Sequence, residues 1–210
     1  MSLTIKSLTA ALKKAGAPLF KGELNVTLVG IRMPTAEQNT FNDVLCVLFQ
    51  QDGKKQLLQY AMTCDPGAYY LENPLNKKGT AVLVPGHYKS CWRLGLHRGK
   101  YHALVQVGEM AVYRDNDKNR SIDIEKAPIE SGVFGINLHR AATNNYTLVV
   151  DKFSAGCQVL ANIDDFNQLM DVVTQSANKY GPVFSYTLLN ADDVHGCTNA
   201  AAAGSRGSAK

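Results

Sequence analysis

Hydrophobic and polar residues alternate along most of the chain with a period near two, which is the pattern of half-buried β-strands. The alternation begins at residues 23–29, Glu-Leu-Asn-Val-Thr-Leu-Val. Segments 39–50 and 55–63 repeat it and flank an Asp-Gly pair that is typical of a hairpin turn. Further apolar runs predict strands at 80–84, 103–107, 110–113, 135–138, 158–160 and 183–189. We therefore expect a mostly β protein.

Two segments instead follow the period of a helix. At residues 7–15, Ser7 is a suitable N-cap and Leu8 and Leu12 share one face, before Gly16 ends the segment. The second segment starts at residue 164 and ends near residue 180, and its apolar positions on one face are Phe166, Leu169, Met170 and Val173. The pattern predicts a short N-terminal helix and one amphipathic C-terminal helix.

The same pattern divides the chain into three parts. Residues 1–20 form an N-terminal helix or arm, 21–190 a single mainly β domain of catalytic type, and 191–210 a flexible low-complexity tail rich in Ala, Gly and Ser. The first strands are either a small separate β-layer or the opening strands of one sheet. With 210 residues and 45% hydrophobic content, the chain can build a substantial core.

Charge and targeting signals narrow the class of protein. The net charge of +4 is spread along the chain and lacks the dense basic stripe of a nucleic-acid-binding protein. Lysines interrupt the first fifteen residues, unlike a secretory signal, and no run approaches the length of a membrane-spanning helix. We expect synthesis in the cytoplasm without a signal peptide, no nucleic-acid partner and no insertion into a membrane.

The sequence predicts neither a metal site nor a cofactor. The five cysteines, at 46, 64, 91, 157 and 197, form no CxxC pair and no zinc-ligand spacing with histidine. Oxygen-bearing residues at alternate positions of 115–123 resemble the start of a calcium loop. However, Arg120 and Lys126 stand where that loop needs Gly and Glu, so a solvated turn is favoured over a calcium site.

The candidate chemistry lies in residues 132–160. His139 ends one short apolar run, and Cys157 follows Ser154-Ala155-Gly156 and begins the next. Two adjacent strands would bring the imidazole beside the thiol, and a thiol so placed becomes a thiolate nucleophile at neutral pH. Gly156 permits a tight turn and lets a substrate carbonyl approach the amide N–H groups of Gly156 and Cys157.

A histidine followed by Ser-x-Gly-Cys resembles the active-site signature of the L,D-transpeptidase (YkuD-type) catalytic domain. The gap here is 154 − 139 = 15 positions, as in that family, and the match covers about thirty residues. The resemblance implies an L,D-transpeptidase-like β-sandwich or mixed sheet that acts on peptidoglycan stem peptides. It also implies that Cys157 is the acylated nucleophile and His139 its base. Ser154 would bond within its loop or towards the histidine.

The substrate contacts are less like the family. Val159 replaces an Arg or Asn two positions after the cysteine, and Arg140 replaces the Gly that commonly follows the histidine. The planar guanidinium of Arg140 is suited to bind a carboxylate in its place. The other candidate substrate contacts are His87, Trp92 and His97. For Trp92 the alternative is packing in the core, and for His97 it is an ordinary half-exposed position in a strand or turn. Asn137 and Asn144 are candidates to orient His139.

Three functions remain open at this stage. The first is a cysteine-dependent acyl-transfer enzyme, more in keeping with a hydrolytic phage lysin or virion-associated muralytic protein than with a cross-linking enzyme. Its partners would be peptidoglycan and other virion or tail proteins, and it would act at the cell wall, in the periplasm or in a phage virion. The second is a non-catalytic virion or tail protein that uses the same fold for wall binding or assembly. The third is a cytosolic cysteine hydrolase with another acyl substrate.

Overall fold

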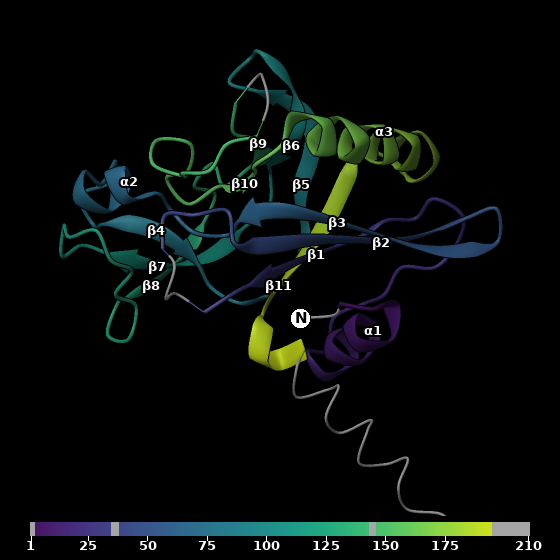
Figure 1. The fold of residues 1–210 in the computed structure, drawn as a ribbon, viewed down its shortest axis with the longest axis horizontal. Helices are drawn as coiled ribbons and strands as arrows, with labels where there is room; N and C mark the ends of the chain where they lie inside the picture. The colour runs from purple at the N-terminus through teal and green to yellow at the C-terminus, as the bar shows by residue number, and fades with distance from the viewer. Residues whose placement is uncertain (1–2, 35–37, 143–145, 195–210) are drawn as a thin grey trace, which may run out of the picture.

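The computed structural model describes residues 3–34, 38–142 and 146–194. Eight strands form a closed barrel, and three further strands form a small sheet beside it (Figure 1). Around the barrel wall the order is β1 (Thr27–Arg32), β11 (Val183–Asn190), β5 (Gly86–His97), β6 (Tyr101–Gln106), β9 (Leu138–Arg140), β10 (Gln158–Leu160), β3 (Lys54–Thr63) and β2 (Asp43–Gln51). The small sheet contains β4 (Thr80–Leu83), β7 (Met110–Asp115) and β8 (Ile129–Gly132).

The mostly β expectation is confirmed, but the large sheet is a barrel and not a sandwich. It is a mixed sheet, because β1 pairs in parallel with β11 and β9 in parallel with β10, while the other pairs are antiparallel. The β1–β11 pair joins the first strand to the last and leaves the sheet without an open edge. The opening strands thus belong to the same sheet as the rest of the domain.

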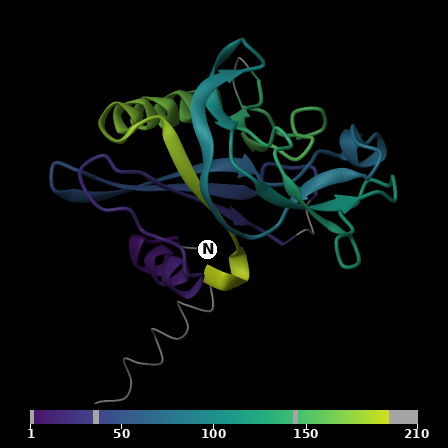
Figure 2. The same ribbon diagram turned by 180° about the vertical axis from the view of Figure 1, so that it is seen from behind.

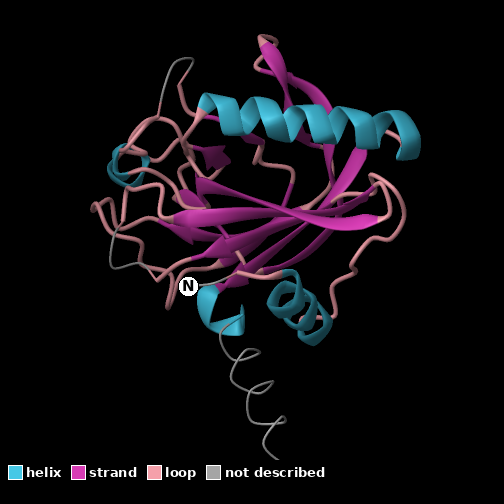
Figure 3. Ribbon diagram, turned by 45° about the vertical axis from the view of Figure 1, so that its right-hand side comes forward, coloured by secondary structure: helices cyan, strands magenta, loops and turns pink. Residues whose placement is uncertain are grey.

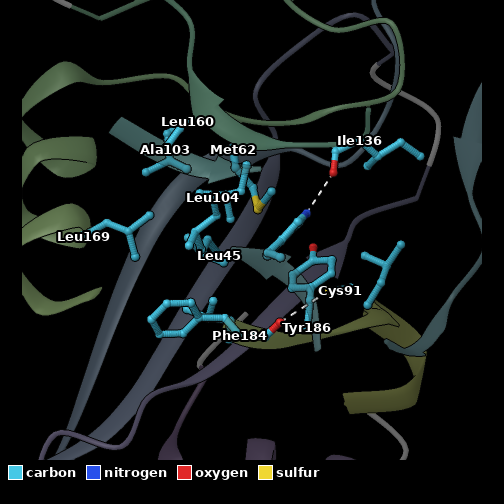
Figure 4. Close-up of a cluster of buried hydrophobic side chains, with 14 of the residues drawn as sticks. Leu45, Met62, Cys91, Ala103, Leu104, Ile136, Leu160, Leu169, Phe184 and Tyr186 are labelled. Carbon is cyan, nitrogen blue, oxygen red and sulfur yellow. Dashed lines mark hydrogen bonds between the residues drawn. The ribbon is translucent and has the colours of Figure 1, made fainter. Parts of the chain in front are cut away.

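Apolar side chains fill the barrel interior (Figure 4). Trp92 is fully buried, its ring lies 4.5 Å from that of Tyr186, and its Nε1 donates to the carbonyl of Ile136 at 2.8 Å. The prediction that Trp92 contacts substrate is therefore wrong, because its side chain is part of the core. Its hydrogen bond nevertheless anchors the segment that leads into β9.

Two helices cover opposite sides of the barrel (Figures 1 and 2). α3 (Ile163–Tyr180) places the four predicted apolar residues in the same buried cluster as the barrel interior. α1 (Ile5–Lys14) packs instead on the outside of β1 and β2, where Leu8 and Leu12 meet Val29 and Cys46. Both predicted helices are confirmed. α1 starts earlier than expected, since Thr4 is the N-cap and Ser7 completes a capping box with it.

The end of the described chain lies beside α1 (Figure 3). Ala191 and Val194 are buried in the same cluster as α1, so the tail predicted from residue 191 cannot begin before residue 195. Residues 195–210, which include Cys197, lie outside the described part. A third helix, α2 (Ala68–Glu72), precedes β4. In the described ranges, no helix has the length and apolar character needed to cross a membrane.

Candidate active site

The parallel pair β9–β10 places the predicted nucleophile and base on one face. Val159 pairs with His139 and Gln158 with Leu138. In this register Cys157, the residue before Gln158, lies beside Asn137. Gln158 accepts a hydrogen bond from Tyr186 Oη at 2.8 Å within the barrel. Because side chains alternate along a strand, Cys157 and His139 both lie on the other face, about 4.8 Å apart across the strands and about 6.6 Å along them. The sequence prediction of adjacent strands is confirmed.

The loop before Cys157 is shaped by Ser154 and Gly156. The buried Ser154 hydroxyl donates to the carbonyl of Cys157 at 2.8 Å and accepts from the N–H of Gly156 at 3.1 Å. Ser154 therefore bonds within its loop and builds the turn, the first of its two expected roles. Since Gly156 N–H is already bonded, the amide of Cys157 is left as the expected oxyanion donor. Gly156 has φ +119° and packs directly against Ala81 of β4.

Cys157 opens into a cavity of about 510 Å³ between the barrel and the small sheet. The barrel contributes His97 at the end of β5 and Arg98 in the turn that follows, while β4 contributes Thr80 and Ala81. The remaining lining comes from the segment between β8 and β9 and from Leu75, Asn76, Gly79, Arg114 and Ala155. The volume is that of a ligand pocket rather than of a packing defect.

The half-buried thiol of Cys157 contacts the segment that leads into β9. Its Sγ donates to the carbonyl of Gly135 at 3.5 Å. Burial raises the pKa of Cys157 above its ordinary value, and the Asn137 amide and the charge of Arg98 oppose that rise only in part. At neutral pH the group is therefore a thiol, contrary to the expectation of a preformed thiolate.

His139 is buried as a neutral base. Its Nδ1 lies 2.8 Å from the carbonyl oxygen of Arg140, which can only accept, so Nδ1 carries the proton and Nε2 a lone pair. Burial lowers the pKa of His139 to about 4, and the neighbouring His97, Arg98 and Arg140 add to that effect. Its ring stacks on that of His97, with 4.2 Å between centroids and 25° between planes. At pH 7 the ring is therefore an uncharged imidazole that presents a lone pair on Nε2.

These pKa shifts predict the pH profile of Cys157 alkylation. The rate with iodoacetamide should rise with pH through 9, without a plateau at neutral pH, because no imidazolium is present to stabilise a thiolate. Intact mass spectrometry measures the rate, with glutathione as the reference thiol. A plateau between pH 5 and 7 would contradict the expected thiol and imidazole pair.

The lowered pKa of His139 also makes the stability of the fold depend on pH. As pH falls from 6.5 towards 4, His139 takes up a proton in the unfolded chain before it does so in the folded chain. The contribution of His139 to the free energy of unfolding is therefore complete above pH 6.5 and is lost as pH falls towards 4.

Two polar side chains beside the predicted nucleophile and base, those of Asn137 and Gln106, organise the site. Asn137 Nδ2 lies 3.1 Å from His97 Nδ1, so Asn137 orients His97 and not, as expected, His139. Gln106 makes four hydrogen bonds with its side chain, to the carbonyls of Gly108 and Gly132 and from the N–H groups of Phe134 and Ile136. Gln106 thereby fixes the wall of the cavity. Asn144 lies outside the described residues.

The other predicted substrate contacts lie away from the cavity. Arg140 stacks its guanidinium over the ring of Tyr101 at 4.3 Å and donates to the carbonyl of Ala142 at 3.0 Å. His87 is at the opposite end of β5 from His97, where its Nδ1 lies 2.9 Å from Thr187 Oγ1 and it lines a separate cavity of about 320 Å³. Neither prediction holds for the Cys157 cavity. Of the four predicted substrate contacts, His97 is the one that lines it.

Residues 115–123, which resemble the start of a calcium loop, form a turn whose carboxylate oxygens accept hydrogen bonds from its own backbone N–H groups. The carboxylate of Asp115 accepts from the N–H of Asp123 at 2.9 Å, and that of Asp117 from the N–H of Asn119 at 3.1 Å. No group of three or more His, Cys, Asp or Glu side chains suited to a metal ion occurs in the part of the chain that the structure describes.

Burial raises the pKa of the core residues Cys46 and Cys91 to about 12, so neither is a reactive thiol.

Comparison with known proteins finds no match to this chain among family models, curated proteins or solved structures.

Proposed function

We propose that the chain is a cysteine acyl-transfer enzyme of the L,D-transpeptidase type that acts on peptidoglycan stem peptides. The register of β9 and β10 supports this most directly, because it puts Cys157 and His139 on one face, and Cys157 lines a cavity of substrate size. The proposal combines that geometry with the Ser-x-Gly-Cys motif and its spacing from the histidine.

The proposed reaction begins when Cys157 Sγ attacks the carbonyl carbon and its proton passes to His139 Nε2. The C=O electron pair moves to the oxygen, which the N–H of Cys157 stabilises. The tetrahedral intermediate then expels the amine, which takes the proton from His139 and leaves a thioester on Cys157. Water or the amine of a second peptide releases the acyl group, which gives hydrolysis or cross-linking respectively. The thiol turns from Gly135 to His139 when substrate enters, since catalytic hydrogen bonds often form only in the complex.

The charge of the cavity favours an anionic substrate. Arg114 is already paired with Glu130 at 2.8 Å, so the positive charge that remains for a ligand is that of the exposed Arg98. Stem peptides carry carboxylates close to their amide bonds, and a guanidinium binds such a group through two hydrogen bonds. Arg98 therefore takes the role that the sequence assigned to Arg140.

Replacing Arg98 with Gln should weaken the reaction with a carboxylate-bearing substrate. We expect the concentration needed for half-maximal acylation to rise about 3–10-fold, because an exposed charged hydrogen bond contributes roughly 1 kcal/mol. Time-resolved intact mass measures this, with Arg140→Gln as the matched variant and little change expected for it. Weakening by Arg140→Gln and not by Arg98→Gln would restore Arg140 as the carboxylate ligand.

The proposed function is tested by treating purified protein with a carbapenem, which acylates activated thiols, and then with purified stem peptides. We expect one adduct per chain, mapped to Cys157 by peptide analysis. The products from stem peptides then distinguish hydrolysis from cross-linking. If no adduct forms on Cys157 and slow reaction is spread over the other thiols, the enzymatic proposal fails and wall binding or virion assembly becomes the alternative to pursue.

A further inference from the structure

The hydrogen bonds around Asn137 fix the protonation of His97. The backbone N–H of Gln106 can only donate, and it donates to Asn137 Oδ1 at 2.8 Å. The other end of the amide, Nδ2, must then be the donor in its 3.1 Å contact with His97 Nδ1. His97 Nδ1 is thus an acceptor, and in the neutral ring the proton lies on Nε2.

The two stacked histidines consequently carry opposite tautomers. His139 is protonated on Nδ1, where it donates to the carbonyl of Arg140, and presents a lone pair on Nε2. His97 accepts on Nδ1 and has an N–H group on Nε2. Both are at least nine-tenths buried, with 6% of His139 and 7% of His97 exposed. The pair therefore combines one base and one hydrogen-bond donor on two stacked rings whose centroids lie 4.2 Å apart.

The backbone amide of Gly156 is not free to serve as a second oxyanion donor. In the expected arrangement two backbone amides, those of Gly156 and Cys157, would share the oxygen. The N–H of Gly156 is instead bonded to Ser154 Oγ at 3.1 Å. His97 and Cys157 line the same cavity, and Asn137 lies between them in the fold: its side chain bonds His97, and its carbonyl accepts from the N–H of Gln158, next to Cys157.

We infer that His97 is a further catalytic residue, whose Nε2–H donates a hydrogen bond to the carbonyl oxygen as Cys157 attacks. This inference rests on the proposed function and assigns the second oxyanion donor of that site. The thiol proton still passes to His139 and returns to the leaving amine. His97 keeps its own proton throughout and binds the negative oxygen that forms when the C=O pair shifts. Burial and the charge of Arg98 lower the pKa of His97, which keeps this donor neutral at pH 7.

The tautomers are tested without reference to activity. In a long-range ¹⁵N–¹H correlation spectrum of the full chain at pH 7, His97 should show the Nε2–H pattern and His139 the Nδ1–H pattern. Spectra of His97→Gln and His139→Gln assign the two rings. A His97 ring that is protonated on Nδ1, or that is cationic at pH 7, would overturn the inference.

The role in the reaction is tested by two substitutions at one position. His97→Phe keeps a ring against His139 but has no donor, and should slow acylation about 10²–10³-fold, the usual cost of one oxyanion donor. His97→Gln places an amide N–H near the position of Nε2 and should recover at least tenfold of that loss. Iodoacetamide alkylation forms no oxyanion, so in both variants its rate should change less than threefold.

The outcomes separate this inference from the proposed function. If wild-type protein is not acylated, the proposed function fails and the role of His97 fails with it. If wild-type protein is acylated and His97→Phe reacts equally fast, only the inference about His97 is wrong. If alkylation falls as much as acylation in both variants, His97 acts by positioning His139 or Cys157 and not on the oxygen. A thermal unfolding curve for each variant shows whether it is folded.

Discussion

Replacing His139 with Gln should slow acylation of Cys157 by about 10³-fold at pH 7, and Cys157→Ala should abolish it. The loss for His139→Gln is in the range of general base catalysis. It should be large here because the pKa of Cys157 is raised, so the thiol does not ionise unaided at neutral pH. Gln retains polarity and a comparable length but cannot take the proton. Intact mass after mixing with a carbapenem measures the rate.

The pH dependence distinguishes a base from a structural residue. The deficit of His139→Gln should shrink as pH rises above 9, where hydroxide removes the proton directly. His102→Gln, an exposed position on the neighbouring β6, is the matched control and should react like wild type. A deficit that stays constant up to pH 10 would mean that His139 holds the loop in place and does not act as the base.

Local patterns predicted the elements of the fold, whereas the closure of the barrel came from distant pairings. The Asp-Gly turn at 52–53 and the alternation on either side of it specify the β2–β3 hairpin within about twenty residues, and both turn residues have positive φ as expected. The β1–β11 pair joins Leu28 to Tyr186, across almost the entire domain. No periodicity records which distant strands meet, so the sequence could not distinguish a sandwich from a barrel.

The candidate site divides in the same way. His139 and Cys157 belong to one local motif and were found from it. His97 and Arg98 reach the cavity from the β5–β6 turn, about forty positions earlier in the chain, where a histidine beside a glycine turn has no distinctive signal. Strand alternation does not reveal which face of a barrel strand is the interior, so the sequence leaves both core packing and substrate contact open for Trp92, and the structure places it in the core.

The surroundings of Val159 exclude a charged residue at this position, where the L,D-transpeptidase motif carries an Arg or Asn. Val159 points to the same face as His139 but lies fully buried against Phe41, Val150 and Ala161, beneath the loop that precedes Ser154. An arginine there would bury a charge with no partner, at a cost of several kcal/mol. Under the proposed function, the exposed Arg98 on the β5–β6 turn binds the carboxylate instead, and it remains hydrated until substrate arrives.

Replacing Gly156 with Ala should both destabilise the protein and inactivate the site. The residue has φ +119°, and a Cβ there would lie 2.5 Å from the carbonyl oxygen of Ala81, a backbone atom of β4 that cannot move without disturbing the small sheet. We expect a loss of about 2–4 kcal/mol in the free energy of unfolding, from left-handed backbone strain and the clash together. Acylation should fall about 10²-fold, because a displacement of 1 Å at the nucleophile is enough to do this. Urea denaturation and carbapenem acylation measure the two effects.

Gly53→Ala separates the clash from the strain. Gly53 also has positive φ, at +73°, but no atom lies within 4 Å of its Cβ position and it is in the remote β2–β3 turn. Strain alone should cost about 1 kcal/mol there and leave acylation unchanged. If Gly156→Ala were as stable and as reactive as Gly53→Ala, the contact between the nucleophile loop and β4 would not be what positions Cys157. A larger loss at Gly156 would mean that the small sheet acts as the rigid support for Cys157.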